Sequence, residues 1–204
     1  YTPANTPPVV FGQYARLADV AGFDLYPLGH CNNNLGAVYD AQRAFNRLYG
    51  RIKPGSAVIV FFGGYGIQSG RQTYLIPVNA QIWTESEVRR DGIGIDAILA
   101  EMNARGAAVK IAILDASRRN PFERRFRSFS AGLAPVIAPN GTLVMYSAAL
   151  SSVISDNGSD HSLFVKELLK EIRTPDLMAE ETLNRTRVGV TRASRSEQVP
   201  WISS

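Results

Sequence analysis

Two hydroxyl side chains stand where apolar, strand-like runs give way to polar residues. Tyr65 lies between two glycines in residues 61–68 (FFGGYGIQ), and Ser117 ends residues 113–117 (ILDAS), two positions after Asp115. A serine hydroxyl becomes a nucleophile when a base within hydrogen-bond reach takes its proton. A tyrosine is a poor base at neutral pH, because its phenol has a pKa of about 10. The two residues therefore need a further base nearby before they could act as a hydrolase.

Other reactive residues do not form the arrangements that known chemistry requires. His30 and Cys31 are adjacent, and adjacent residues in an extended segment point to opposite faces, so they do not form a dyad. The chain has two histidines and one cysteine, too few for a convincing zinc site. The glycines around Tyr65 are one residue off the dinucleotide-binding spacing, and no phosphate-binding lysine follows them. We therefore expect no metal and no cofactor.

The composition fits a single domain over residues 1–204. With 204 residues and 45% hydrophobic content, the chain can bury a full core. No apolar run reaches the roughly 18 residues that a membrane helix needs. The net charge of +4 comes without a lysine-rich tract, so we attribute it to solubility and expect no nucleic-acid partner.

The compartment stays open at the level of sequence. Cys31 is the single cysteine, which rules out an intrachain disulfide and says nothing firm about the redox environment. The sequence begins with Tyr1 rather than methionine, so we expect an upstream segment, with a removed signal peptide among the possibilities.

Strand-like and helix-like runs alternate along the chain. Short runs rich in Val and Ile predict strands, and runs with apolar residues every three or four positions predict helices. The predicted strands are Asp24–Leu28, Ala57–Phe62, Thr73–Val78 (the weakest), Val109–Leu114 and Thr142–Ser147, and the predicted helices are Leu35–Tyr49, Ile95–Arg105, Leu163–Ile172 and Ala179–Thr191. This order predicts an α/β fold with a mostly parallel sheet and helices on both faces. Ligands of such sheets bind beyond the carboxyl ends of the strands, where Tyr65 and Ser117 are expected.

The longest stretch without periodicity covers residues 117–141. It carries five arginines interleaved with phenylalanines, between Arg118 and Phe129. A loop of this length in a compact domain is usually functional or mobile. A solvated loop anchored by a few aromatic side chains is the alternative.

Residues 61–68 and 113–122 together resemble the two catalytic motifs of the caspase-like cysteine peptidases, in the bacterial metacaspase or orthocaspase branch. In that family the first strand runs into Ser-Gly-His-Gly and the second into Asp-Ala-Cys-Arg. Tyr65 stands at the histidine position and Ser117 at the cysteine position. Further runs similar to the family are residues 74–80 (YLIPVNA, with Asn79 for an aspartate), 161–164 (HSLF), 187–190 (RVGV) and 198–201 (QVPW).

The resemblance implies a caspase-like three-layer sandwich that has lost its peptidase chemistry. Losing one member of a nucleophile–base pair costs on the order of 10⁴ to 10⁶ in rate, and here both are replaced. The resemblance also implies that the backbone N–H groups of Gly66 and Ser117 occupy the oxyanion-hole positions. Asp115 matches the acidic residue that selects Arg or Lys substrates. We expect Asp115 to be held by an internal donor, such as an arginine of residues 118–127, or to lie open to a basic partner.

The implied function is that of a pseudopeptidase, a pseudo-orthocaspase that acts as a binding, scaffolding or regulatory module. The implied partner is a protein or peptide, and basic ones are among the candidates. One alternative is an Arg/Lys-specific cysteine endopeptidase in which an engineered serine replaces the native cysteine. A second is a residual hydrolase. For the site itself, the simplest interpretation is that Tyr65 and Ser117 hydrogen-bond to each other and fill it.

The resemblance leaves the first strand of the sheet open. Tyr1 resembles the residue of a turn that follows the family's central strand, with Phe11–Ala21 as the first helix. On this interpretation the central strand lies upstream of residue 1. Alternatively, Val9–Phe11 forms a shortened version of it.

Overall fold

The computed structural model describes residues 36–77, 80, 82–117, 132–154 and 161–204, with side chains described from residue 42 onward. The features predicted before residue 36, namely the strand Asp24–Leu28, the helix Phe11–Ala21 and the shortened strand Val9–Phe11, lie outside these residues. So do the arginines of residues 118–127.

The described residues contain a four-stranded sheet in the order β1-β5-β6-β7. The three strands β1 (Ala57–Gly63), β5 (Val109–Asp115) and β6 (Thr142–Tyr146) run parallel, and β7 (Trp201–Ser203) is antiparallel to β6. All seven residues of β5 are buried, as expected for a strand paired on both edges and covered on both faces. The predicted mostly parallel sheet is therefore confirmed.

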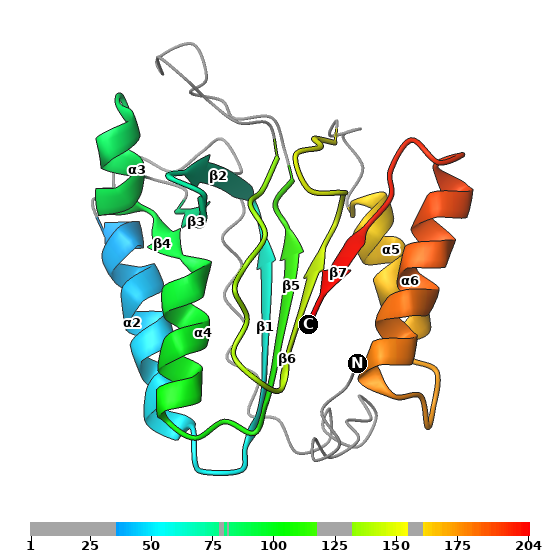
Figure 1. Ribbon diagram of the computed structural model, residues 1–204, viewed down its shortest axis with the longest axis horizontal. Coiled ribbons are helices and arrows are strands. Elements are labelled where there is room, and N and C mark those ends of the chain that lie inside the picture. The colour runs from blue at the N-terminus through cyan, green and yellow to red at the C-terminus, as the bar shows by residue number, and fades with distance from the viewer. Residues whose placement is uncertain (1–35, 78–79, 81, 118–131, 155–160) are drawn as a thin grey trace.

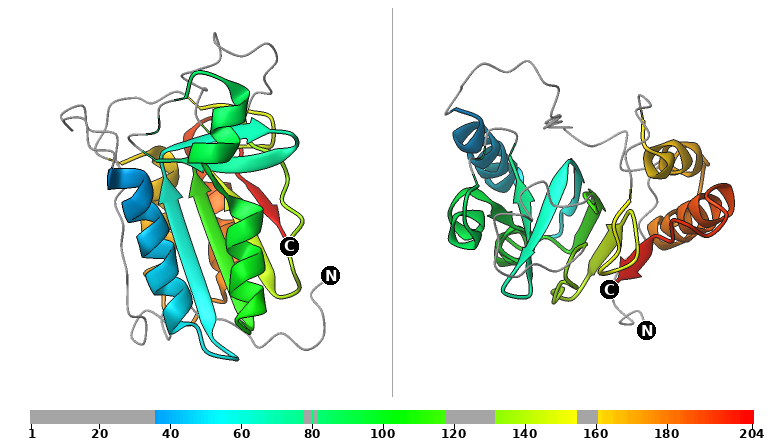
Figure 2. Two further views of the ribbon diagram at one scale, coloured as in Figure 1. Left: turned by 90° about the vertical axis from the view of Figure 1, so that its left-hand side faces the viewer. Right: turned by 90° about the horizontal axis from the view of Figure 1, so that it is seen from above.

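Helices cover both faces of this sheet, which gives the predicted three-layer α/β sandwich. Helices α2 (Gly36–Arg51) and α4 (Ile95–Ala104) lie on one side, and α5 (Leu163–Glu171) and α6 (Ala179–Ala193) lie on the other (Figures 1 and 2). Alternate residues of each strand face the two layers. Thus Leu114 belongs to the core beside α4, whereas its neighbour Ile113 packs with Phe164 of α5.

A smaller antiparallel sheet stands at the carboxyl edge of the main one (Figure 1). Its strands are β2 (Tyr65–Ser69), β3 (Gln72–Ile76) and the short β4 (Ile93–Gly94), in that order. Helix α3 (Glu85–Asp91) packs on it through the buried Val88. The sequence predicted β3 approximately, but β2, β4, α3 and β7 were not predicted.

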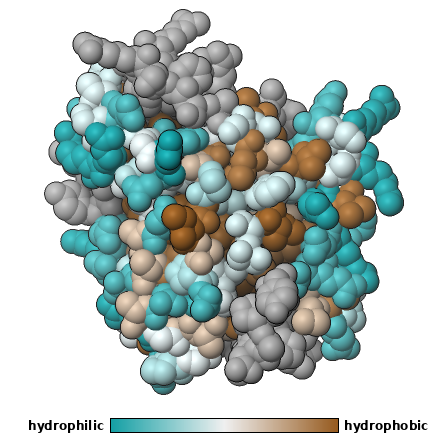
Figure 3. Space-filling model, viewed as in Figure 1, coloured by the Kyte–Doolittle hydropathy of each residue, from teal (hydrophilic) through white to brown (hydrophobic). Residues whose placement is uncertain are grey.

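The surface view follows this layering. In Figure 3 apolar residues gather along the middle of the molecule and hydrophilic residues cover the two flanks, where the helices lie. Among the helices that the structure describes, none has both the length and the apolar character needed to cross a membrane.

Candidate functional site

The carboxyl ends of β1 and β5 bring the two predicted site positions onto adjoining segments. The strands are in register up to the pair Gly63 and Asp115. Beyond it, the Gly64 N–H donates to the Asp115 carbonyl at 3.2 Å, and the Gly66 N–H donates to the Ala116 carbonyl at 3.1 Å. Tyr65 and Ser117 therefore flank the same short backbone ladder, at the edge of the sheet where the sequence predicted them.

Ser117 is buried, and no described residue offers its hydroxyl a base within hydrogen-bond reach. The residue is 1% exposed, and its carbonyl accepts the Ile154 N–H at 2.8 Å. Its Oγ atom has no hydrogen-bond partner among the residues that the structure describes. The expected direct hydrogen bond between the Tyr65 and Ser117 hydroxyls is therefore wrong for this conformation.

The aromatic ring of Tyr65 has a packing role. It is half-buried and lies against the apolar cluster formed by β2, β3 and α3, which contains Ile67, Ile76, Ile82 and Val88. The ring is thus part of the apolar core of the small sheet. Burial of this aromatic surface accounts for a large, mostly apolar side chain at this position.

Asp115 is held by the start of a helix. The residue is 2% exposed, and the Ser162 hydroxyl donates to its Oδ2 atom at 2.6 Å. The same Ser162 Oγ caps α5 by accepting the Val165 N–H at 3.1 Å. Ser162 thus links the Asp115 carboxylate to the first turn of α5. Of the two expectations for Asp115, an internal donor is the one observed, and Ser162 is such a donor among the residues that the structure describes.

The position predicted for the oxyanion hole is covered in this conformation. The Gly66 N–H is engaged by the Ala116 carbonyl, as described above. A Cβ atom built on Gly66 would lie 2.5 Å from Cδ2 of Leu133, which is 1% exposed. Leu133 therefore seals Gly66 from solvent, and it does so from within the predicted loop 117–141.

Residues 132–136, which we call the cover segment, are tied down on both sides. The Ala134 N–H donates to Thr73 Oγ1 at 3.0 Å, and the Thr73 hydroxyl donates to the Ala134 carbonyl at 3.2 Å. The Val136 N–H donates to the hydroxyl of the buried Tyr146 at 3.1 Å. A solvated loop is therefore the wrong description for this part of residues 117–141.

Metal and imidazole chemistry find little support in the part of the chain that is described. Within it, no group of three or more His, Cys, Asp and Glu side chains could hold a metal ion. His161 is exposed and immediately precedes the helix cap Ser162. It makes no hydrogen bond to the Ser117 hydroxyl.

We predict that Ser162→Ala lowers the free energy of unfolding by about 1–3 kcal/mol, because one change removes the α5 cap and a donor to a buried carboxylate. Urea unfolding followed by circular dichroism measures this. Ser162→Thr keeps the hydroxyl and is the matched control, expected to stay within about 1 kcal/mol of the parent. Equal stability of the parent and the alanine variant would contradict the coupling between Asp115 and α5.

Comparison with protein families gives one match. The model of the caspase domain family matches residues 35–204, which include every helix and strand described above. No curated protein matches the chain.

Proposed function

The chain belongs to the caspase domain family, and we propose that it is a member without peptidase activity that serves as a binding, scaffolding or regulatory module. We further propose that it lies in the bacterial metacaspase or orthocaspase branch, on the strength of residues 113–122 and 74–80. The observation that carries the proposal is the buried Ser117 hydroxyl, which has no hydrogen-bond partner among the described residues.

The chemistry of the two replaced positions supports this proposal. A cysteine peptidase needs a thiol with a pKa of about 8.5 and an imidazole near 6.5, which can exchange a proton at neutral pH. Neither a serine hydroxyl nor a tyrosine phenol provides such a group. The Tyr65 ring also packs against the apolar cluster of β2, β3 and α3.

The former substrate pocket supports a non-catalytic role as well. We propose that Asp115, which would select a basic substrate residue in a peptidase of this type, serves here to anchor α5 through Ser162. Its 2% exposure leaves little surface for an incoming Arg or Lys side chain. Leu133 covers Gly66 in the same conformation, so we propose that the oxyanion-hole positions Gly66 and Ser117 are not used.

A peptidase assay tests the proposal. We predict that Arg- and Lys-containing peptides are cleaved no faster with the purified chain than in buffer alone. The reason is that removing a nucleophile–base pair costs on the order of 10⁶ in rate. A fluorogenic peptide panel and an activity-based probe for serine and cysteine hydrolases measure this. Cleavage that disappears in Ser117→Ala would overturn the proposal and favour a residual hydrolase.

Two further variants separate the alternatives. Ser117→Cys with Tyr65 retained reproduces the peptidase that an engineered serine would have inactivated. Because Tyr65 cannot act as the base, we expect this variant to be inactive. Activity in this single variant would show that only the cysteine was missing, and would favour the endopeptidase interpretation. His161→Ala should leave the peptide-cleavage rate unchanged, because this imidazole makes no hydrogen bond to the Ser117 hydroxyl.

A further inference from the structure

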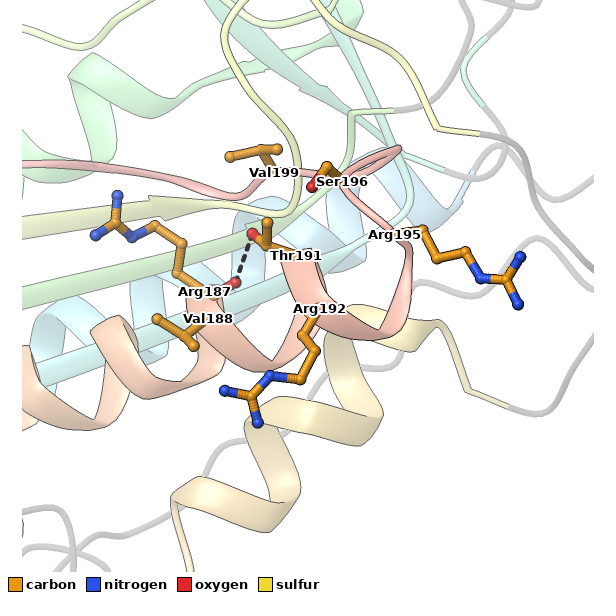
Figure 4. A pocket seen from close by; sticks show the side chains of 7 residues that line it. All are labelled: Arg187, Val188, Thr191, Arg192, Arg195, Ser196 and Val199. Carbon is orange, nitrogen blue, oxygen red and sulfur yellow. Dashed lines mark hydrogen bonds between the residues drawn. The ribbon is translucent and has the colours of Figure 1, made fainter.

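A pocket of about 510 Å³ lies at the carboxyl end of α6, which is next to β7 at the end of the sheet opposite β1. It is lined by the last turns of the helix and by the turn that leads to β7 (Figure 4). We call it the α6 arginine surface and define it by the residues Arg187, Val188, Arg192, Arg195, Ser196 and Val199.

Within the part of the chain that the structure describes, the three arginines of this surface have no acidic partner. None of their guanidinium groups makes a salt bridge or a side-chain hydrogen bond with any residue that the structure describes. Arg185, on the same helix, shows the contrast, because it binds Glu181 at 2.6 Å. In Figure 4 their guanidinium groups point in three different directions from the end of α6, so the positive charge is spread around the pocket and does not converge on one point. Such a spread of positive charge still attracts anions.

The backbone beneath the surface is strained. Arg195 and Ser196 have φ angles of 52° and 69°, in the left-handed region that glycine adopts at lower cost. This pair ends the helix, with the Ser196 N–H donating to the Thr191 carbonyl at 2.8 Å. Glycine would serve that purpose better, so ending the helix does not explain an arginine at position 195.

Exposed apolar side chains lie among the arginines. Val188 is 51% exposed and Val199 is 38% exposed, and both line the pocket. Arginine side chains bind carboxylates through two parallel hydrogen bonds, whereas valines contact aliphatic groups. A ligand that fits both carries carboxylates on either side of an aliphatic residue. A nucleic acid fits less well, because its phosphates favour a longer basic stripe and its bases favour aromatic platforms.

We propose that the α6 arginine surface binds an acidic peptide segment of a partner protein, with its carboxylates on Arg187, Arg192 and Arg195 and an aliphatic side chain on Val188 and Val199. The surface lies beside β7, at one end of the four-stranded sheet. Tyr65 comes shortly after β1, the strand at the other end of that sheet. The proposal goes beyond the loss of peptidase activity and does not depend on it.

Fluorescence anisotropy tests the charge requirement. The probe is a short fluorescein-labelled peptide that alternates glutamate with valine, and its counterpart has glutamine in place of every glutamate. The chain should bind the glutamate peptide and not the glutamine peptide, and the affinity should fall as salt is added. Arg187→Gln combined with Arg192→Gln should weaken binding by at least about tenfold. Arg185→Gln is the matched control and should leave it unchanged.

Arg195→Gly separates binding from stability. The variant loses a guanidinium and relieves the left-handed strain, so peptide affinity should fall by roughly tenfold while the melting temperature holds or rises. Absence of binding by the parent, equal binding of both peptides, or unchanged affinity in the arginine variants would each overturn the proposal. Tighter, arginine-dependent binding of a single-stranded oligonucleotide or of anionic vesicles would also overturn it and assign the surface to that ligand.

Discussion

Gly132→Ala should lower the free energy of unfolding by on the order of 3 kcal/mol or more, because the added methyl group has no space. Gly132 has a φ of +69°, and a Cβ atom there would lie 2.5 Å from the Ser152 carbonyl oxygen and 2.6 Å from the Ser152 nitrogen. Both are backbone atoms, so a side-chain rotation cannot relieve the clash. The cover segment would have to move, and with it Leu133, which seals Gly66.

Gly70→Ala is the matched control for this prediction. Gly70 also has a positive φ, of +56°, but nothing lies within 4 Å of a Cβ atom built there. Its replacement therefore measures the backbone strain alone, which we expect to cost about 1 kcal/mol. The difference between the two variants in urea unfolding isolates the close approach of the cover segment to Ser152. Equal losses would mean that the segment adapts without cost.

The larger elements could be predicted because each one repeats its pattern several times. The strands β1, β5 and β6 and the helices α2, α4, α5 and α6 lie within a few residues of the predicted ranges. The strand β7 has only three residues, and β4 has two, so neither provides a periodic pattern. Their pairing comes from tertiary contacts, which a local pattern does not encode.

Two of the missed elements, β2 and α3, did carry local signals. The strands β2 and β3 join through Gly70 and Arg71, both with positive φ, which is the geometry of a two-residue hairpin turn. The glycine was visible in the sequence, but an arginine is unusual at the second position. Helix α3 begins with a capping box of Thr84 and Glu87. Its seven residues are mostly charged, so no apolar period drew attention to it.

The sequence predicts only those site residues that directly follow a strand, and it does not predict those that tertiary packing brings to the site. Tyr65, Asp115 and Ser117 follow strands, and the rule for parallel sheets places them at one edge. Ser162, which donates to Asp115, is 47 positions away, and Leu133 reaches Gly66 from a stretch without periodicity. A serine before an apolar run is a common helix start, so the cap at Ser162 had a local signal that the sequence prediction did not use. Its second role depends on how α5 docks on the sheet.

The packing of α5 on the sheet is the basis of the second prediction with a large effect on stability. Phe164→Ala should lower the free energy of unfolding by about 3–5 kcal/mol, because it opens a cavity in the layer between the sheet and the helices. Phe164 is fully buried and belongs to the same apolar cluster as Ile111 and Ile113 of β5. It lies two residues after Ser162, so we expect the ring that docks α5 to position the cap beside Asp115 as well. Urea unfolding measures the loss.

Leu169→Ala, on the same helix, is the matched control, since Leu169 is 38% exposed and its loss should stay within about 1 kcal/mol.

Combining Phe164→Ala with Ser162→Ala then tests the link to the site. If Phe164 positions the cap, the second change should cost less in the variant than in the parent, because the Ser162–Asp115 bond is already weakened. Strict additivity would mean that the cap holds Asp115 independently of how α5 is packed. A loss for Phe164→Ala no larger than for Leu169→Ala would show that α5 does not dock through this ring.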